Sequence, residues 1–161
     1  MAKRQLLHLG EDTLRKASRP VDILNKRMLT LLDDMAETMY ELEGAGLAAP
    51  QVGVLRRAIV IDVGDDNGLI QMVNPEIISR EGEQECVEGC LSIPGLRGYV
   101  LRPQKVSVRG VARSGKEITI DAEGYLAVAF CHEIDHLDGC LFIDKMTREA
   151  TEEELADKTE E

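Results

Sequence analysis

The chain has no tryptophan, and only three tyrosines and two phenylalanines among its 161 residues. It therefore offers no row of aromatic side chains on which nucleotide bases could stack. Basic residues are also in the minority, with 19 Lys and Arg against 30 Asp and Glu and a formal net charge of −11. Binding to phosphate backbones depends on clustered Lys and Arg, so we expect no direct nucleic-acid binding. We attribute the acidic charge mainly to solubility.

Long apolar runs are missing as well, so no segment is expected to span a membrane. The opening residues "MAKRQLLHLGEDTLRK" turn polar too early for a secretory signal. These absences predict a cytoplasmic protein. In that compartment cysteines remain reduced or bind metals, and we do not expect disulfides. The four cysteines are Cys86, Cys90, Cys131 and Cys140.

Apolar residues recur at helical spacing in residues 25–44 and 125–139, whereas residues 57–63 and 69–73 are short apolar runs typical of strands. Two further alternating segments flank "RSGK", which predicts a hairpin. The small-residue stretch 44–53 is expected to be a loop. These elements predict the α+β class, as one compact domain at residues 1–146 with mixed or antiparallel strands around a central histidine-bearing helix and with flanking helices. Residues 147–161 are acidic with almost no apolar face, and we expect a solvated tail.

The segment "CHEIDHLDG", residues 131–139, carries the strongest chemical signal. Positions four apart share one face of a helix, so His132 and His136 can direct two ring nitrogens at one metal ion. Glu133 lies about 100° further round the helix, where it can act as a base on water held by that metal. The alternative is a charged helix whose histidines pair with Asp135 and Asp138.

A third ligand is not obvious from this helix. Cys140 lies eight residues after His132, about 12 Å along a continued helix, which is too far. Cys131 points away from the ligand face and should lie in the core. Upstream, Cys86 and Cys90 are both suitable thiolates. In an extended strand they face the same side, so alternation does not choose between them, and Gly89 only hints at Cys90.

Three segments in this order, "GAGLAAPQ", "EGCLS" and "HEIDH", resemble the signature motifs of bacterial peptide deformylases. The opening "LLHLGEDTLRKASRPVD" and the closing "LDGCLFIDKM" are also similar to that family, so the resemblance extends to about Lys145. The leucine of "EGCLS" resembles the type 1 branch. The resemblance implies a metal-dependent hydrolase that removes the formyl group from the N-terminal formyl-methionine of new polypeptides and releases formate.

The resemblance also implies roles for individual residues. Cys90 would be the third metal ligand beside His132 and His136, with an open position for the water that attacks the formyl carbon. Glu133 would be the general base and acid, while the Gln51 side chain and the Leu91 N–H would bind the formyl oxygen. Small residues around the site, an arginine and an apolar stretch of the histidine helix would bind substrate. These predicted substrate-binding residues are Gly44, Ala45, Gly46, Gly89, Arg97, Val128 and Ala129.

The ligand set suits several divalent metals. The resemblance favours Fe(II), with Zn(II) or Ni(II) as substitutes. The implied partners are N-formylmethionyl peptides or nascent chains, and we expect a monomer. Proximity to the ribosome would not be mediated by the acidic tail, because ribosomal RNA is itself negative.

Two features depart from the family pattern, namely the acidic tail and Cys131, which stands where glutamine is common. Two rival functions also stay open: another metal-dependent peptidase, and a non-catalytic metal-binding protein that has kept the fold.

Overall fold

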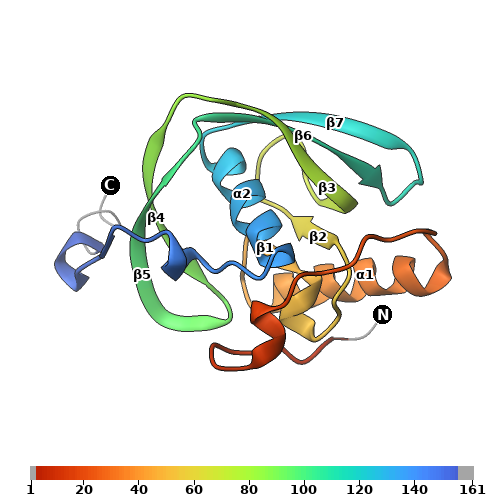
Figure 1. Cartoon of the computed structure of the whole chain (residues 1–161), viewed down its shortest axis with the longest axis horizontal. Helices are drawn as coiled ribbons and strands as arrows, with labels where there is room; N and C mark the ends of the chain where they lie inside the picture. The colour runs from red at the N-terminus through yellow and green to blue at the C-terminus, as the bar shows by residue number, and fades with distance from the viewer. Residues whose placement is uncertain (1–2, 156–161) are drawn as a thin grey trace.

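Helix α2 (Tyr125–Leu137) runs through the middle of the molecule in the computed structural model, which describes residues 3–155 (Figure 1). Eleven of its 13 residues are buried. The sequence "LAVAF" at its start leaves no polar face, and a helix that is apolar nearly all round must be covered on several sides. The histidines of "HEIDH" are therefore carried into the interior.

A five-stranded antiparallel sheet covers one side of α2, in the order β1 (Gly46–Ala48), β2 (Ala58–Ile61), β3 (Ile70–Glu81), β6 (Lys105–Ala112) and β7 (Glu117–Glu123). All four residues of β2 are buried, because both faces of the sheet are covered here. Ile59 and Ile61 belong to the core around α2, while Ala58 and Val60 belong to the core around α1. The alternation of side chains along one strand thus serves two cores.

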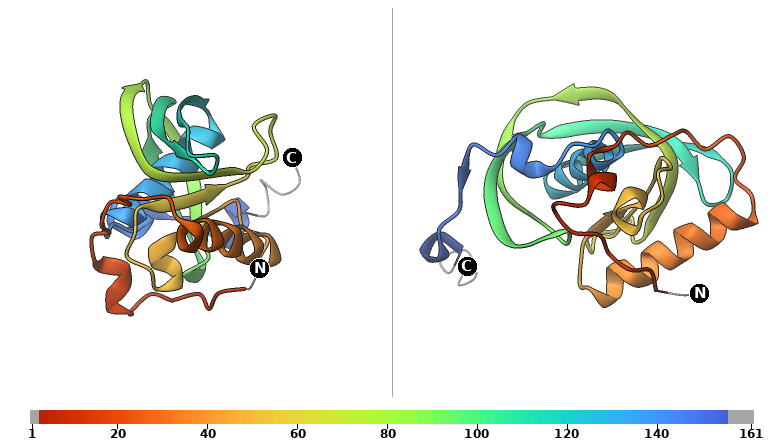
Figure 2. Two further views of the ribbon diagram at one scale, coloured as in Figure 1. Left: turned by 90° about the vertical axis from the view of Figure 1, so that its right-hand side faces the viewer. Right: turned by 60° about the horizontal axis from the view of Figure 1, so that its bottom comes forward.

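Helix α1 (Lys26–Glu41) packs on the opposite face of β1 and β2 (Figure 2). Its first turn is capped by Asn25, whose side chain accepts a hydrogen bond from the Met28 N–H at 3.0 Å. Its buried stripe includes Leu31, Leu32 and Met35. Strand β1 is consequently held between two helices, with one edge paired to β2.

A second, three-stranded sheet contains β4 (Gln84–Cys90), β5 (Ile93–Arg102) and β8 (Arg148–Glu149). Strand β3 continues into β4 through a turn at Gly82, whose φ of 69° suits glycine. Strands β4 and β5 form a hairpin whose last pair is Cys90 with Ile93. Cys90 is thereby placed at a tight turn beside α2.

The N-terminal segment, which includes η1 (Asp12–Arg15), ties these parts together. The Leu7 N–H donates to the Gln51 carbonyl at 2.7 Å, and the Leu9 N–H donates to the Ser92 carbonyl at 2.9 Å. These two bonds fix η2 and the β4–β5 turn relative to one another. Both elements carry predicted site residues.

The predicted α+β fold, a single small domain with antiparallel sheets around a central helix, is confirmed. Two local predictions are wrong in detail. Residues 44–53 are not only a loop, because they contain β1 and the short helix η2 (Ala49–Val52). The strand predicted at 69–73 extends to Glu81 because it pairs first with β2 and then with β6. The second helix ends near Gly139 as predicted: its last residue is Leu137, and Gly139 follows with φ 78°.

The part of the predicted tail that is described lies against β5, after η3 (Phe142–Asp144). The Thr147 N–H donates to the Tyr99 carbonyl at 2.8 Å, and the Ala150 N–H donates to the Arg97 carbonyl at 2.9 Å. The Glu154 carboxylate accepts bonds from Arg148 at 2.9 Å and from the Tyr99 hydroxyl. Residues 156–161 of the predicted tail lie outside the described residues.

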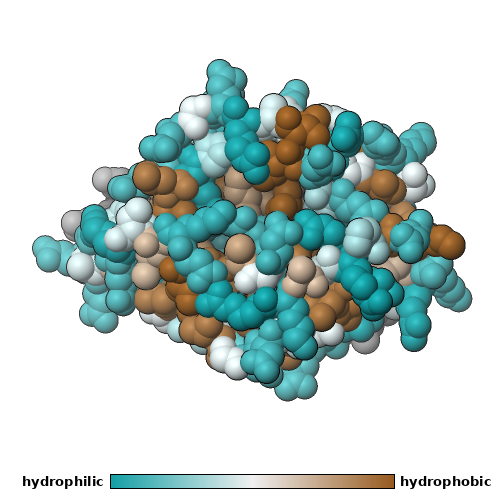
Figure 3. All heavy atoms as spheres, viewed as in Figure 1, coloured by the Kyte–Doolittle hydropathy of each residue, from teal (hydrophilic) through white to brown (hydrophobic). Residues whose placement is uncertain are grey.

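The surface seen in Figure 3 is mainly hydrophilic, with apolar residues in small separate patches. Exposed large apolar side chains such as Ile23, Tyr125 and Leu101 come from different parts of the chain. Within residues 3–155, no helix has the length and apolar character needed to cross a membrane.

Candidate active site

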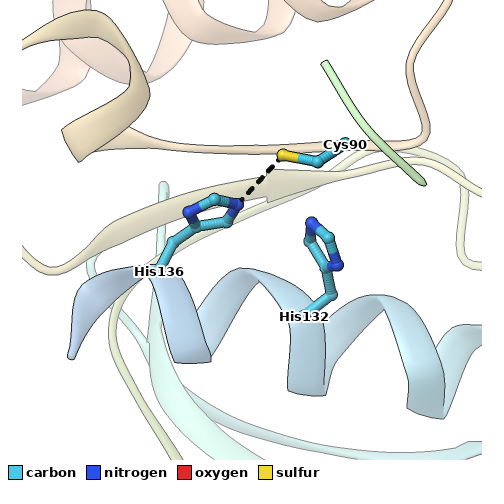
Figure 4. Close-up of side chains that lie close together, drawn as sticks. All are labelled: Cys90, His132 and His136. Atoms are coloured by element: carbon cyan, nitrogen blue, oxygen red, sulfur yellow. Dashed lines mark hydrogen bonds between the residues drawn. The ribbon is translucent and has the colours of Figure 1, made fainter. Parts of the chain in front are cut away.

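The side chains of Cys90, His132 and His136 point toward one another between the β4–β5 turn and α2 (Figure 4). One potential ligand atom from each lies within 4.8 Å of the others, and all three residues are buried. The two histidines meet because they are four residues apart on α2, with ring centroids separated by 5.0 Å. Cys90 is brought to them by the β4–β5 hairpin, with its Sγ 3.4 Å from His136 Nε2.

The chemistry of this donor set fits a divalent metal. Thiolate and imidazole are the ligands that Zn(II) and related transition metals prefer, and three protein ligands leave a position open. The Nδ1 atom of His132 lies 2.8 Å from Glu88 Oε1, so Nε2 is the nitrogen left for a metal. His136 likewise presents Nε2 to Cys90. The structure thus brings together the three residues predicted as ligands.

Glu88 anchors His132 and is itself held by Arg102. The Arg102 guanidinium donates two bonds to the Glu88 carboxylate, at 2.7 and 2.8 Å, and a third to Asp135 at 2.7 Å. Burial alone would raise the pKa of Glu88, but the bonds from Arg102 and His132 outweigh it and lower that pKa to about 2. Glu88 is therefore a carboxylate at neutral pH and a permanent acceptor for the imidazole.

The environments of the two histidines differ. Burial lowers the pKa of both, but His132 also faces Glu133, Cys90 and Glu88, which together raise its pKa above the ordinary value. His136 also lies against Cys90, but burial, together with the neighbouring His132 and Arg102, lowers its pKa, and Glu88 opposes this only in part. The His132 ring additionally stacks on Phe142, with centroids 6.1 Å apart. The negative groups around His132 would equally favour a bound cation.

Glu133 lies beside this group with 5% of its surface exposed. Its Oε1 has no hydrogen-bond partner within the described residues. Burial raises the pKa of its carboxyl to about 7, which suits a group that takes up and returns a proton near neutral pH. A Cβ atom at Gly46 would overlap the Glu133 carboxylate, so glycine there lets β1 approach the acid closely.

Gln51 reaches the site from η2. Its Oε1 accepts the Ala48 N–H at 2.9 Å, and its Nε2 points to Ser92 Oγ at 3.0 Å and to Cys90 Sγ at 3.5 Å. The amide nitrogen is thereby directed at the three-donor group. Leu91 follows Cys90 directly in the turn, and its side chain packs against Gly44. Two predicted hydrogen-bond donors thus lie beside the candidate metal ligands.

A cleft of about 450 Å³ opens from these residues to the surface. One wall is formed by the segment before and within β1, another by the β4–β5 hairpin, and the floor by α2. The structure brings all the predicted substrate-binding residues to this cleft, and their roles stay predictions. Those residues are Gly44, Ala45, Gly46, Gly89, Arg97, Val128 and Ala129.

The remaining cysteines stand apart from this group. Cys86 is half-buried, and its thiol lies 3.5 Å from Glu88 Oε2 and from the Val100 carbonyl. The register of β4 against β5 shifts between Glu88 and Cys90, so strict alternation does not hold there. Cys131 lies in the core around α2, where burial raises its pKa. Cys140 is half-buried beyond the end of α2.

Sequence reasoning assigned no role to several residues that shape the site. Glu88 stands inside the "EGCLS" motif, two positions before Cys90, and a carboxylate so near a ligand could have been noticed. Arg102 had no local signal, because it reaches Glu88 only through the hairpin pairing. Ser92, Tyr125 and Glu43 were also missed. The hydrogen bond that orients His132 comes from Glu88 and not from position 131, where the family commonly has glutamine.

Comparison with known proteins places this geometry in context. A family model described as Polypeptide deformylase matches residues 3–152. A peptide deformylase of Acetivibrio thermocellus is 56% identical over 160 residues, which cover 99% of this chain and 93% of that protein. The likeness therefore extends over the whole described fold.

Solved structures agree with the sequence comparisons. The crystal structure of a peptide deformylase from Legionella pneumophila has a TM-score of 0.86 at 44% identity, covering 98% of this chain and 92% of that one. The peptide deformylase of Thermotoga maritima gives 0.87 at 36% identity, covering 91% of this chain and 99% of that one. Each likeness covers at least 91% of this chain.

Proposed function

The chain belongs to the peptide deformylase family, and on that premise we propose that it removes the formyl group from the N-terminal formyl-methionine of newly made polypeptides, releasing formate. One observation carries the proposal. Glu133, Gln51, Cys90 and His132 line a single cleft, and His136 lies beside Cys90 with its Nε2 3.4 Å from the Cys90 Sγ. A peptidase or a metal store would need the three-donor group but not this arrangement of Gln51 against Cys90.

The reaction is the hydrolysis of an amide bond. Cys90, His132 and His136 would hold a divalent metal, which when bound would supply Lewis acidity and lower the pKa of water toward ~7. Glu133 accepts a proton from the attacking water and returns it to the amine that leaves. Burial raises the pKa of the Glu133 carboxyl to about 7. The same carboxyl can therefore accept the proton and later donate it.

Negative charge develops on the formyl oxygen as water adds to the carbon. The Gln51 amide and the Leu91 N–H lie beside the three-donor group and would donate hydrogen bonds to that oxygen. A donor of this kind typically contributes ~3 kcal/mol to the transition state. Gln51 is already oriented by the Ala48 N–H, so little reorganisation is needed.

The substrate would lie along the edge of β1. This strand is the last of its sheet, and one edge is not paired to a strand in the described residues. An extended peptide can add to such an edge through its backbone, with help from Arg97 on the opposite wall. Val128 and Ala129 lie four and three residues before His132, so they offer an apolar floor for the methionine side chain.

We propose Fe(II) as the working metal, with Zn(II) or Ni(II) as substitutes, since the mixed sulfur and nitrogen donors accept all three. We further propose that the enzyme acts as a monomer in the cytoplasm, on chains leaving the ribosome.

The test is turnover of formyl-Met-Ala-Ser by metal-loaded protein, with formate and free amino acids measured separately. We expect formate alone. Glu133→Ala should lower turnover by about 10²–10⁴-fold, because a positioned base is lost. Its metal content should stay near one per chain, since Glu133 is not among the three donors. Release of amino acids without formate would contradict the proposal, as would normal turnover by Glu133→Ala.

A further inference from the structure

Tyr40 and Asp62 join the last turn of helix α1 to the residue that follows strand β2. The Tyr40 hydroxyl donates to Asp62 Oδ2 at 2.6 Å, and the Gly64 N–H donates to Asp62 Oδ1 at 3.0 Å. Burial and the bond to Asp62 raise the pKa of Tyr40 to about 12, while the bond from Tyr40 lowers the pKa of Asp62. Around neutral pH the phenol is therefore a donor and the carboxylate an acceptor.

The same aspartate holds one wall of the cleft through its backbone. The Asp62 N–H donates to the Ala45 carbonyl at 2.9 Å, and the next pair along the two strands is Gly46 with Ile61. In an antiparallel pair, residues that exchange such bonds alternate with residues whose main-chain groups point the other way. The N–H and C=O of Gly46 therefore face the edge of β1 that no strand within residues 3–155 pairs with, where the substrate backbone would add.

This wall has little room to move. A Cβ atom at Gly46 would overlap a Glu133 carboxylate oxygen, and one at Gly44 would overlap the Leu91 side chain. The two glycines thus let the wall lie in close contact with the proposed base and with the turn that carries Leu91. A small shift of the wall would change how a peptide backbone lies against both.

The turn that leads into the wall is held at both of its ends. Glu43 has a φ of 57°, a left-handed conformation that is unfavourable for a residue with a Cβ atom and that persists only where its surroundings fix it. On the helix side, the Glu43 N–H donates to the Tyr40 carbonyl at 3.1 Å and the Gly44 N–H to the Met39 carbonyl at 3.0 Å. On the strand side it is held by Asp62, so the bond between Tyr40 and Asp62 ties the two ends to each other.

We propose that Tyr40 is a positioning residue, which acts through Asp62 to hold residues 44–46 in place for the peptide backbone of the substrate. Neither Tyr40 nor Asp62 lines the cleft, so the pair acts through the wall and not on the substrate directly. The inference rests on the proposed deformylation and adds to it a residue outside the three sequence motifs. The formyl group and the methionine side chain would bind at the inner end of the cleft, so the bond should matter most for the residues after methionine.

The experiment compares formyl-Met-Ala-Ser with formyl-methioninamide, which lacks the residues that would follow the wall beyond the methionine. For Tyr40→Phe we expect kcat/KM of the tripeptide to fall by about 2–10-fold, the range of one net hydrogen bond. The fall should appear mainly in KM, because the reacting groups are untouched. Turnover of the amide should change little, so the ratio of kcat/KM between tripeptide and amide should fall. A general loss of structure would instead lower both substrates equally.

Further variants locate the cause. Asp62→Ala should lower the ratio at least as far, and adding Tyr40→Phe to it should change nothing more, because the bond is already lost. Asp62→Asn keeps an oxygen that can accept from the Tyr40 hydroxyl, and it should keep most of the wild-type ratio. The matched control is Ser107→Ala, which removes a hydroxyl that donates to Asp121 at 2.6 Å, between β6 and β7 and away from the cleft. It should keep the wild-type ratio.

Three results would overturn this inference alone. They are an unchanged ratio in Tyr40→Phe, an equal loss of turnover on both substrates, and a further fall when Tyr40→Phe is added to Asp62→Ala. A fall of the ratio in Ser107→Ala would do the same, because the effect would then not be specific to the wall. If the wild type released no formate from either substrate, the proposed deformylation would fall together with this inference.

Discussion

Replacing Arg102 by methionine would leave the buried Glu88 carboxylate without its cation, whereas Asp135 would keep its ion pair with Lys145 at 3.1 Å. Arg102 and Glu88 expose only 3% and 4% of their side chains, so the pair is buried. The guanidinium makes three bonds, two to Glu88 and one to Asp135. Methionine fills a similar volume but donates none of them, so the charge of Glu88 would be buried without compensation.

The expected cost follows from that burial. Removing one partner of a buried ion pair destabilises a protein by about 3–5 kcal/mol, because the remaining charge stays desolvated. For a chain of this size each kcal/mol lowers the melting temperature by roughly 2–4 °C, so we expect a fall of about 6–20 °C. Arg109 offers a matched exposed control: its bonds to Glu76 and Glu117 are 3.5 and 3.8 Å long, and 47% of its side chain is exposed. Arg109→Met should cost no more than about 1 kcal/mol.

The assay is urea unfolding of metal-free protein, so that metal affinity does not enter the comparison. The double variant Arg102→Met with Glu88→Gln should recover much of the loss, because glutamine removes the buried charge but keeps an acceptor for His132. Metal affinity of Arg102→Met should also fall, by about 10–100-fold, since the orientation of His132 is loosened. If Arg102→Met lost no more stability than Arg109→Met, the reasoning about burial would be refuted.

Two other predictions test the choice of ligand and the tail. Cys90→Ser should lose activity and bind metal weakly, because a hydroxyl is a poor substitute for a thiolate, whereas Cys86→Ser should keep its metal. Metal analysis of both variants tests this prediction, and the reverse result would show that Cys86 is the ligand. Deletion of all residues after Arg148 should keep turnover of a short formyl-Met peptide within a few-fold, because the residues that meet at the cleft precede it. The same deletion should not weaken co-sedimentation with ribosomes at matched salt, since an acidic segment is repelled by RNA; a clear loss would show that the segment binds a basic partner there.

Helical periodicity was enough to place His132, Glu133 and His136. A helix fixes the relation of residues one turn apart, so the two histidines had to share a face and Glu133 had to lie beside it. The same rule put Val128 and Ala129 near His132. Motif resemblance then supplied Cys90 and Gln51, and the family that it indicated is the one the comparisons show.

The choice between Cys86 and Cys90 could not be read from alternation. The register of β4 shifts after Glu88, and only that irregularity and the turn to β5 bring Cys90 to His136 while Cys86 stays beside Glu88. The secondary structure of the small-residue segment 44–53 could not be predicted from its sequence either. The stretch that holds β1 has no periodic pattern, and it becomes a strand because two helices cover it and β2 pairs with it.

The hydrogen bonds that hold His132 in place, from His132 to Glu88 and from Arg102 to Glu88, depend on tertiary structure alone. Glu88 and Arg102 are fourteen residues apart and meet through the hairpin, and Glu88 then reaches a histidine forty-four residues further along the chain. A sequence specifies contacts within one turn of a helix directly, because local geometry is fixed by the backbone. Contacts between strands depend on register and bulges, which arise only when the sheets pack around α2.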